Sequence, residues 1–450
     1  MYGKINSALA LLLAGSAFIT RSVVESKLVF AHYMVGSVDS QTTHAQQDID
    51  GAINVGFDAF ALNVGSPGAD WAKNTVQQLF DYAGDKSFKL FFSFDFYGNG
   101  DIGQHQTLFD QFKDHPAHLK YGPNDLPVVS SYSGGSIGPD TWRNFKNTNN
   151  VYLIPNPEAD GNYYNNPTAF FQSWGDAVDG VFSWETAWPE TSEKPANVSS
   201  ERDQAVKTAA DAAGKAYVMG LSSLQYKHCC GDSWYRGGET NLPERMEQIL
   251  SVSPEFTEVI TWINPTNPPP PSQNDAGESH YIGPCWAEGL TEEILQYGNS
   301  DTTPHSGWQP IIASFVDAFK AGATDVGAMK PRSGAFAGAL WYRGVLTTCS
   351  GDKPRGSGAA VDAVNYAVVL PADSNGLSVR VSSGGQVLAT QAVHGGLNYN
   401  SVVGMTTGAQ KIELVDAGGQ VIAQANGAVD VSNDAANGFC NYNYYVAGLQ

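Results

Sequence analysis

The sequence predicts an α/β protein: a (β/α)8 barrel of the TIM type followed by a small C-terminal antiparallel β-sandwich. Up to about residue 350, strand-like apolar runs alternate with amphipathic helical segments, which is typical of a parallel sheet covered by helices. Runs such as Phe88-Lys89-Leu90-Phe91-Phe92 are largely apolar along their length, as expected when helices cover both faces. Beyond that point short alternating runs are separated by Gly, Asn and Asp, which indicates antiparallel strands.

The length of the chain accommodates both units. Its 450 residues exceed the roughly 250 to 350 residues that one barrel needs. We therefore expect a leader over residues 1–26, a barrel over 27–350 and a sandwich over 351–450. The leader has Lys4 before an apolar run and small residues around Ala14 and Ala17, as in a secretory signal peptide. A membrane anchor or a buried first strand is the alternative, although the run is short for a span.

The predicted elements alternate along the chain. The strands are expected at Leu28–Met34, Phe57–Asn63, Phe88–Asp95, Pro127–Ser131, Val151–Ile154, Gly180–Trp184, Ala216–Leu221 and Glu258–Trp262. The clearest helical segments are expected at Thr43–Val55, Ala72–Tyr82, Thr168–Ala177, Ser200–Ala213, Leu242–Leu250 and Gln309–Ala321. Eight strands suffice to close a barrel. A doubly wound open sheet is the alternative, but no GxGxxG turn follows the first strand.

The C-terminal unit is expected to support the barrel. Its strands are predicted at Ala363–Leu370, Leu377–Val381, Lys411–Leu414 and Val421–Ala423. No tryptophan follows Trp341, so a sugar-binding surface there would depend on Tyr399 or on the tyrosines of residues 442–445. Because carbohydrate-binding surfaces depend on aromatic anchors, a supporting role is the preferred interpretation.

Composition and motifs narrow the possible partners. A net charge of −20 disfavours nucleic acid and anionic membranes, because like charges repel, and is compatible with a neutral polysaccharide. The five cysteines fit an oxidising compartment without revealing their pairing. No CxxC spacing, histidine cluster or GxxxxGK[ST] loop is present, so neither a metal nor another cofactor is expected. Asn197-Val198-Ser199 is a glycosylation sequon. We expect a monomer.

Two carboxylates three positions apart, Asp275 and Glu278, follow the last predicted strand. Cleavage of an acetal needs a proton donor and a base or nucleophile. Inverting enzymes hold two carboxyl groups about 6.5 to 9.5 Å apart, which two residues on an irregular loop can reach, and Gly277 favours such a loop. We assign Glu278 as the acid, with a raised pKa, and Asp275 as the base, although the roles could be exchanged. The alternative is a solvated loop with chance acidic residues.

Other strand ends and loops supply candidates for substrate binding. Polar and aromatic residues suit hydroxyl recognition and stacking on sugar rings, and the last motif adds aromatic neighbours. Each also has a structural alternative, such as a helix cap for Asp95 or a core position for Trp184. The candidates are His32, Tyr33, Asn63, Asp95, Trp184, Glu185, Tyr226, His228, Trp234, Trp262, His280 and Tyr281.

Four runs together resemble the fungal α-1,3-glucanases, or mutanases, of glycoside hydrolase family 71 over residues 27–450. They are residues 28–36 (LVFAHYMVG), 89–95 (KLFFSFD), 179–185 (DGVFSWE) and 274–282 (NDAGESHYI). The resemblance implies a catalytic barrel with a C-terminal β-sandwich, endo-acting hydrolysis of α-1,3-glucan with inversion, and no metal. By match, it also implies that Asp275 and Glu278 are the catalytic pair.

One departure from the family pattern precedes this pair. In the family the strand-end tryptophan is followed at once by Asn-Asp, whereas here the proline-rich residues Ile263–Gln273 intervene. Such sequence does not pair into a sheet, so it either loops out over the cleft or displaces Asp275; a mis-spliced gene model would also produce it. A non-catalytic or weakened polysaccharide-binding barrel, or a structural wall protein, is therefore the rival interpretation.

Overall fold

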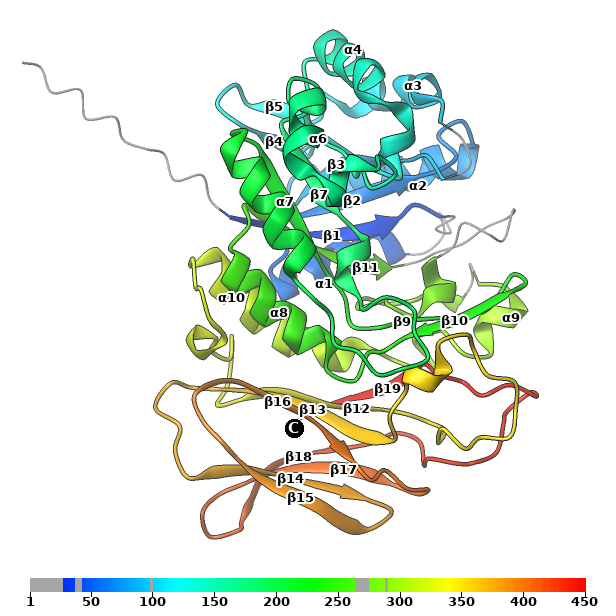
Figure 1. Ribbon diagram of the computed structural model, residues 1–450, viewed down its shortest axis with the longest axis vertical. Helices are drawn as coiled ribbons and strands as arrows, with labels where there is room; N and C mark the ends of the chain where they lie inside the picture. Colours follow the sequence, from blue (N-terminus) through cyan, green and yellow to red (C-terminus); the bar gives the residue numbers. More distant parts are fainter. Residues whose placement is uncertain (1–26, 37–42, 98–99, 264–274, 288–289) are drawn as a thin grey trace, which may run out of the picture.

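The computed structural model describes residues 27–450 except 37–42, 98–99, 264–274 and 288–289. The expected leader over residues 1–26 and all but Ile263 of the proline-rich segment lie outside the described residues. Figure 1 shows a helix-covered sheet in the upper part of the molecule and antiparallel strands of the C-terminal residues below it.

The upper part is a curled sheet of nine strands. Its order is β4-β5-β3-β2-β1-β11-β8-β7, with β6 paired to the other edge of β5. Apart from the short antiparallel β4 the paired neighbours are parallel. The bounds are β1 Leu28–Met34, β2 Ala59–Val64, β3 Lys89–Asp95, β4 Lys120–Tyr121, β5 Leu126–Tyr132, β6 Tyr152–Ile154, β7 Gly180–Ser183, β8 Ala216–Leu221 and β11 Phe256–Ile263.

The helices lie outside this sheet in the order that alternation predicts (Figure 1). The α-helices are α1 His44–Val55, α2 Asp70–Ala83, α3 Gln106–Phe112, α4 Pro139–Asn149, α5 Asn162–Asn165, α6 Pro167–Trp174, α7 Glu201–Ala212, α8 Asn241–Val252, α9 Glu292–Leu295 and α10 Gln309–Lys320. The mixed α/β class is therefore confirmed, and a strand of the sheet occurs at each of the eight predicted positions. Between β6 and β7 two backbone hydrogen bonds run from Asp179 N–H to Leu153 O and from Phe182 N–H to Pro155 O, without a continuous ladder among the described residues.

Alternation along β1 separates two cores. Phe30 points to the inside of the curled sheet, where its ring lies 4.9 Å from Phe91 and 5.4 Å from Phe256. Val29, Ala31 and Tyr33 belong instead to the larger core between sheet and helices. Because side chains of a strand alternate between its faces, His32 shares the inner side with Phe30. This alternation decides which strand-end residues can reach a site inside the curl.

The C-terminal unit consists of two four-stranded antiparallel sheets, β16-β13-β12-β19 and β15-β14-β17-β18, with an apolar core between them. Their bounds are β12 Ala337–Arg343, β13 Ala363–Leu370, β14 Leu377–Ser383, β15 Gln386–Val393, β16 Gly396–Val403, β17 Gln410–Val415, β18 Val421–Asn426 and β19 Tyr444–Gly448. β12 precedes the expected boundary at residue 350, yet it pairs with β13 and β19. A disulfide joins Cys349 to Cys440.

A hairpin that the sequence analysis did not predict follows β8. It consists of β9 Gln225–Cys229 and β10 Asp232–Arg236. Its two-residue turn, Cys230-Gly231, has positive φ at both residues, 62° and 77°, as in the primed turns that match strand twist. The outer edge of β10 continues into the loop after β12, because Tyr235 N–H donates to Arg355 O and Arg355 N–H donates to Ser233 O.

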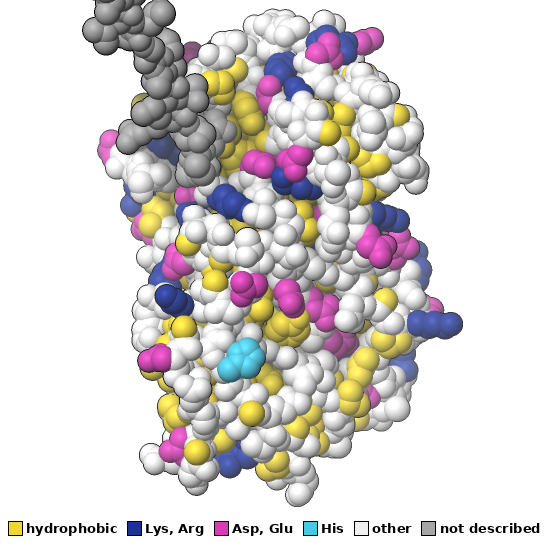
Figure 2. Space-filling view, turned by 60° about the vertical axis from the view of Figure 1, so that its left-hand side comes forward, with side chains coloured by type: hydrophobic (Ala, Val, Ile, Leu, Met, Phe, Trp, Pro, Cys, Tyr) yellow, Lys and Arg dark blue, Asp and Glu magenta, His cyan; other side chains and the backbone are white. Residues whose placement is uncertain are grey.

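The surface carries few charges relative to its size. On the face drawn in Figure 2, acidic and basic side chains are scattered among uncharged ones. Among the described residues, no helix combines the length and apolar character that crossing a membrane requires, and no cluster of three or more His, Cys, Asp and Glu could hold a metal ion.

Candidate active site

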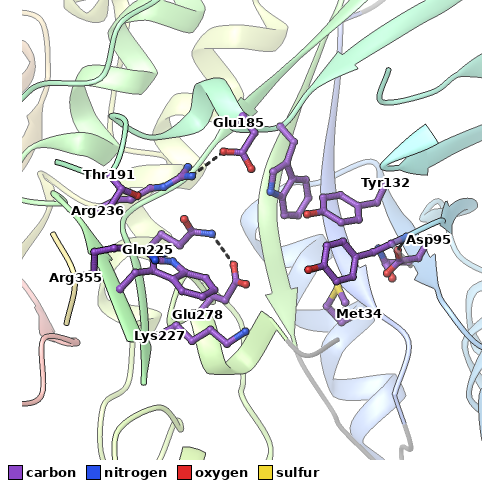
Figure 3. A pocket seen from close by; sticks show the side chains of 14 residues that line it. Met34, Asp95, Tyr132, Glu185, Thr191, Gln225, Lys227, Arg236, Glu278 and Arg355 are labelled. Carbon is purple, nitrogen blue, oxygen red and sulfur yellow. Dashed lines mark hydrogen bonds and ion pairs between the residues drawn. The ribbon is translucent and has the colours of Figure 1, made fainter. Parts of the chain in front are cut away.

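A cleft with a cavity volume of about 250 Å³ opens at the carboxyl ends of the sheet strands. Residues at or near the ends of β1, β2, β3, β5 and β7 form part of it, and the β9–β10 hairpin and the loop of Arg355 form the opposite wall (Figure 3). The lining residues are Met34, Asn63, Asp95, Tyr97, Tyr132, Trp184, Glu185, Thr191, Gln225, Lys227, Trp234, Arg236, Glu278 and Arg355.

Glu278 is a carboxylate of this cleft that contacts two polar side chains, Gln225 and His280. Its Oε2 accepts a hydrogen bond of 2.6 Å from Gln225 Nε2 and lies 3.3 Å from Nε2 of the buried His280. Burial by itself raises the pKa of Glu278, but the hydrogen bond and charge of His280, the charge of Lys227 and the amide of Gln225 lower it, and the pKa lies below its ordinary value. The raised pKa expected from the sequence is therefore wrong, because these neighbours outweigh burial.

The segment that carries Glu278 is a short 3-10 helix, Asp275–Glu278, rather than an irregular loop. Gly277 lets it pack on the hairpin, because a Cβ there would lie 2.8 Å from Cys229 Sγ. The returning chain is hydrogen bonded to β11, from Ile282 N–H to Thr261 O and from Gly283 N–H to Trp262 O. The side chain of Asp275 lies outside the described residues, so its separation from Glu278 stays untested.

Asp95 lies across the cleft from Glu278 (Figure 3), and Asn63 also lines the cleft. Burial raises the pKa of Asp95, against smaller opposing effects of Tyr97 N–H, the charge of His32 and the amide of Asn63. The expected alternative of a helix cap is not its contact here, since its Oδ1 accepts from Tyr97 N–H in the loop after β3.

A buried pair lies on the inner side of β1 and β11. His32 Nδ1 is 2.6 Å from Glu258 Oε1, with both side chains almost fully buried. The ring of Trp184 meets His32 edge-on with its centroid 4.8 Å away. His32 is not a lining residue of the cleft, so it can act on a substrate only through Trp184, Asp95 or water.

The backbone of Trp184 and Glu185 is hydrogen bonded to a carboxylate, Glu158, that the sequence analysis did not predict. Glu158, in the loop after β6, accepts hydrogen bonds from the backbone N–H groups of Trp184 and Glu185 at 2.8 and 2.9 Å, and one from Tyr164 Oη. Burial raises the pKa of Glu158 to about 7. Glu185 in turn accepts from Arg236 Nη2 at 2.8 Å, which joins the β7 side of the cleft to the hairpin.

The hairpin presents one of its faces to the cleft. Gln225 and Lys227 alternate along β9, and Arg236 and Trp234 lie directly opposite them on β10. The Lys227 ammonium lies 4.7 Å from the centroid of the Trp234 ring. This face therefore combines an aromatic surface with amide and cationic groups.

Seven predicted substrate-binding residues are not among those that line the cleft. Two of them, His32 and His280, contact the carboxylates of Glu258 and Glu278 instead. Tyr33 donates to Asp48 on α1, and Trp262 packs against Phe57 and Phe60 in the outer core. The remaining three make other contacts: Tyr226 with Tyr442, His228 stacked on Phe439, and Tyr281 with Thr303.

Strand alternation is the sequence signal that distinguishes residues facing the cleft from residues facing away from it. Tyr226 and His228 occupy alternate positions to Gln225 and Lys227 on β9, so the two pairs face opposite sides. Recognising the Cys230-Gly231 turn as a hairpin would have placed Gln225, Lys227 and Arg236 beside Trp234. Thr191 and Arg355 come from distant loops and leave no local signal.

Known proteins resemble the chain over nearly its whole length. A family model described as Glycosyl hydrolase family 71 matches residues 25–450. A mutanase of Penicillium rubens is 31% identical over 441 residues, which cover 95% of this chain and 89% of that protein. A glucan endo-1,3-alpha-glucosidase of Schizosaccharomyces pombe, agn1, is 29% identical and covers 80% and 78% of the two chains. An ascus wall endo-1,3-alpha-glucanase of the same yeast is 25% identical, with 94% and 97% covered.

Proposed function

Because the chain belongs to glycosyl hydrolase family 71, we propose that this glycoside hydrolase is a secreted enzyme that cleaves α-1,3-glucan internally with inversion. The observation that carries the proposal is the carboxylate of Glu278, which contacts Gln225 and His280 in a cleft lined by Trp184, Trp234 and Tyr132. The substrate class follows the names of the relatives, which are a mutanase and two α-1,3-glucanases.

The lowered pKa of Glu278 supports the exchanged assignment of the catalytic roles. As a carboxylate, Glu278 accepts a proton from the water that attacks the anomeric carbon. Asp275 donates a proton to the departing glycosidic oxygen, on the opposite side of the sugar. Asp95 and Asn63 hold sugar hydroxyls, and Trp184 and Trp234 stack on the sugar rings.

We also propose that the curled sheet closes into a complete (β/α)8 barrel. The two hydrogen bonds between β6 and β7 support closure at the remaining gap. The pairing of β12 with β13 and β19 supports a domain boundary just before Ala337 rather than at residue 350. In this proposal a signal peptide precedes residue 27. Asn197, which is exposed, carries a glycan. The protein acts as a monomer on a neutral polysaccharide, without nucleic acid or membrane partners.

A reducing-sugar assay on insoluble α-1,3-glucan tests the reaction. We expect Asp275→Asn and Glu278→Gln each to lower the rate at least about 100-fold, which is the usual contribution of a general acid or base. Asp81→Asn on α2, outside the cleft, is the matched control and should keep the wild-type rate. Equal rates in all four proteins would end the hydrolase proposal for this site.

The stereochemistry is tested separately. Proton NMR of the first product should show the β anomer, because attack from the face opposite the leaving group inverts the configuration. A first product in the α configuration would contradict inversion and leave the hydrolase assignment intact.

A further inference from the structure

Lys227 is a cation buried in a cleft that is proposed to bind a neutral polymer. Only 7% of its surface is exposed, and charged groups that deeply buried are costly unless they are compensated. Its ammonium lies over the Trp234 ring, 4.7 Å from the centroid. A contact with an aromatic face stabilises a cation without neutralising it, so the field of Lys227 extends into the cleft.

The register of the hairpin directs that field toward Glu278. Gln225 lies two residues before Lys227 on the same face of β9, and its amide donates directly to Glu278 Oε2. Trp234 is the cross-strand partner of Lys227, so the indole holds the ammonium on the same face of the hairpin as this amide. Figure 3 shows Lys227 and Glu278 next to each other on the hairpin side of the cleft.

We propose that Lys227 is a positioning residue for hydrolysis, whose charge keeps the half-buried Glu278 in the carboxylate form that a water-activating base requires. This inference rests on the proposed role of Glu278. Under this inference Lys227 lines the cleft and also determines the charge of Glu278.

Two kinds of charged group surround Glu278 besides Lys227. His280 contacts Glu278 directly, at 3.3 Å, and its hydrogen bond and charge lower the pKa of Glu278 more than Lys227 does, so the charge of Lys227 adds to that of His280. Arg236 on β10 is neutralised by Glu185, and Arg355 is exposed, so water screens it. Asp95 on β3 is the acidic group that faces Glu278 from across the cleft. Among the effects on the pKa of Glu278, burial is the largest and raises it, and the charge of Lys227 is one of those that lower it.

The acidic limb of the pH profile of kcat/KM tests the proposal. Lys227→Met removes the charge and keeps most of the side-chain volume, and should move the limb upward by about 1 pH unit, as removal of a nearby opposite charge does. At a pH well below the limb this shift equals a roughly tenfold loss of kcat/KM. Lys227→Arg keeps the charge and should leave the limb in place. Lys227→Gln is a second neutral variant in case Lys227→Met does not fold.

The control is Lys113→Met at the C-cap of α3, which removes the same charge outside the cleft and should not move the limb. If Lys227→Met raises KM or lowers the unfolding temperature while the limb stays at the wild-type pH, Lys227 is a substrate contact or a packing residue and the proposal is overturned.

A titration that needs no turnover separates this inference from the proposed function. In protein labelled with ¹³C at the glutamate carboxyl carbons, the Glu278 signal, assigned by its loss in Glu278→Gln, should titrate at higher pH in Lys227→Met than in wild type. If wild type hydrolyses no glucan but the titration moves, the hydrolase proposal fails and the effect of Lys227 on Glu278 holds. An unmoved titration overturns the inference whatever the activity.

Discussion

Two half-buried glutamates of the same molecule have pKa values shifted in opposite directions. Burial raises the pKa of both, but at Glu278 the charges of His280 and Lys227 and two hydrogen bonds reverse the effect. At Glu158 the neighbouring Glu185 adds repulsion, and the pKa rises to about 7 despite hydrogen bonds from Tyr164, Asn156 and the backbone. The identity of a carboxylate in the sequence therefore does not determine its role; the charges that the fold places around it do.

Glu158 should make the stability of the protein depend on pH. Its pKa is 4.5 ordinarily and about 7 in the folded protein, so the folded state retains a proton that the unfolded state has lost. Stability should fall as the pH rises from about 4.5 to about 7, by at most about 3 kcal/mol, and should be fully present at lower pH. Glu158→Gln keeps an acceptor for the Trp184 and Glu185 N–H groups and should remove this dependence.

Urea unfolding of wild type and Glu158→Gln at about pH 5 and about pH 8 measures how the free energy of unfolding of each protein changes with pH, since these values bracket the titration of Glu158. The contributions of other titrating groups cancel when the two proteins are compared. Parallel changes in wild type and Glu158→Gln would contradict the assigned pKa.

At the scale of the element, the hairpin shows what sequence patterns reveal and what they miss. Trp234 was selected as an aromatic residue in a loop, and it lines the cleft. Tyr226 and His228 were selected for the same reason, but they pack on Tyr442 and Phe439. Short polar strands such as Gln225–Cys229 lack the apolar run that marked the sheet strands, so their alternation went unrecognised.

The two faces of the hairpin should respond differently to truncation. Trp234→Ala removes a cleft-lining ring and should raise KM for glucan about tenfold, equivalent to about 1.4 kcal/mol of lost binding. His228→Ala removes a ring stacked on Phe439 at 4.0 Å and should lower the unfolding temperature while KM stays unchanged. Steady-state kinetics and thermal unfolding of both variants provide the test; a raised KM in His228→Ala would contradict the orientation of the faces.

Strand β11 shows why a correctly predicted strand still hides its site geometry. The predicted strand Glu258–Trp262 is present within β11, but the register of β11 with β1 shifts between Ala31 and Tyr33. Thr261 there has φ of 70°, which is strained for a β-branched residue. Such an irregularity re-aims the end of a strand, and this one lies where Ile282 and Gly283, just after Glu278, are hydrogen bonded to β11. Nothing in the local sequence encodes it, because it depends on the partner strand.

At the scale of the whole molecule, the two units were foreseeable and their junction was not. Periodicity located the sheet strands and four strands of the C-terminal sheets. β12 was included in the barrel domain because an apolar run carries no information about which sheet it joins. Its contacts with β13 and β19, both later in the chain, are long-range and are decided only in the folded molecule.

The disulfide that closes this junction should contribute measurably to stability. Cys349 and Cys440 are 91 residues apart, and a cross-link over such a loop typically stabilises a protein by about 2 to 4 kcal/mol. We expect the double variant Cys349→Ser, Cys440→Ser to have a free energy of unfolding lower by that amount, and therefore to unfold at a lower urea concentration. Cys230→Ser, which leaves the bridge intact, should stay near wild type. A double variant with the wild-type midpoint would show that the bridge does not constrain the unfolded chain.

The loop of Arg355 has a consequence for recombining this enzyme with its relatives. It follows β12 and the disulfide, yet it extends the edge of β10, and Gly356 N–H is bound by Glu193 at 2.6 Å. One wall of the groove is thus assembled from both units. A chimera whose crossover falls anywhere between β10 and Arg355 would combine a hairpin from one parent with an Arg355 loop from the other, so functional shuffling should require both segments to come from the same parent.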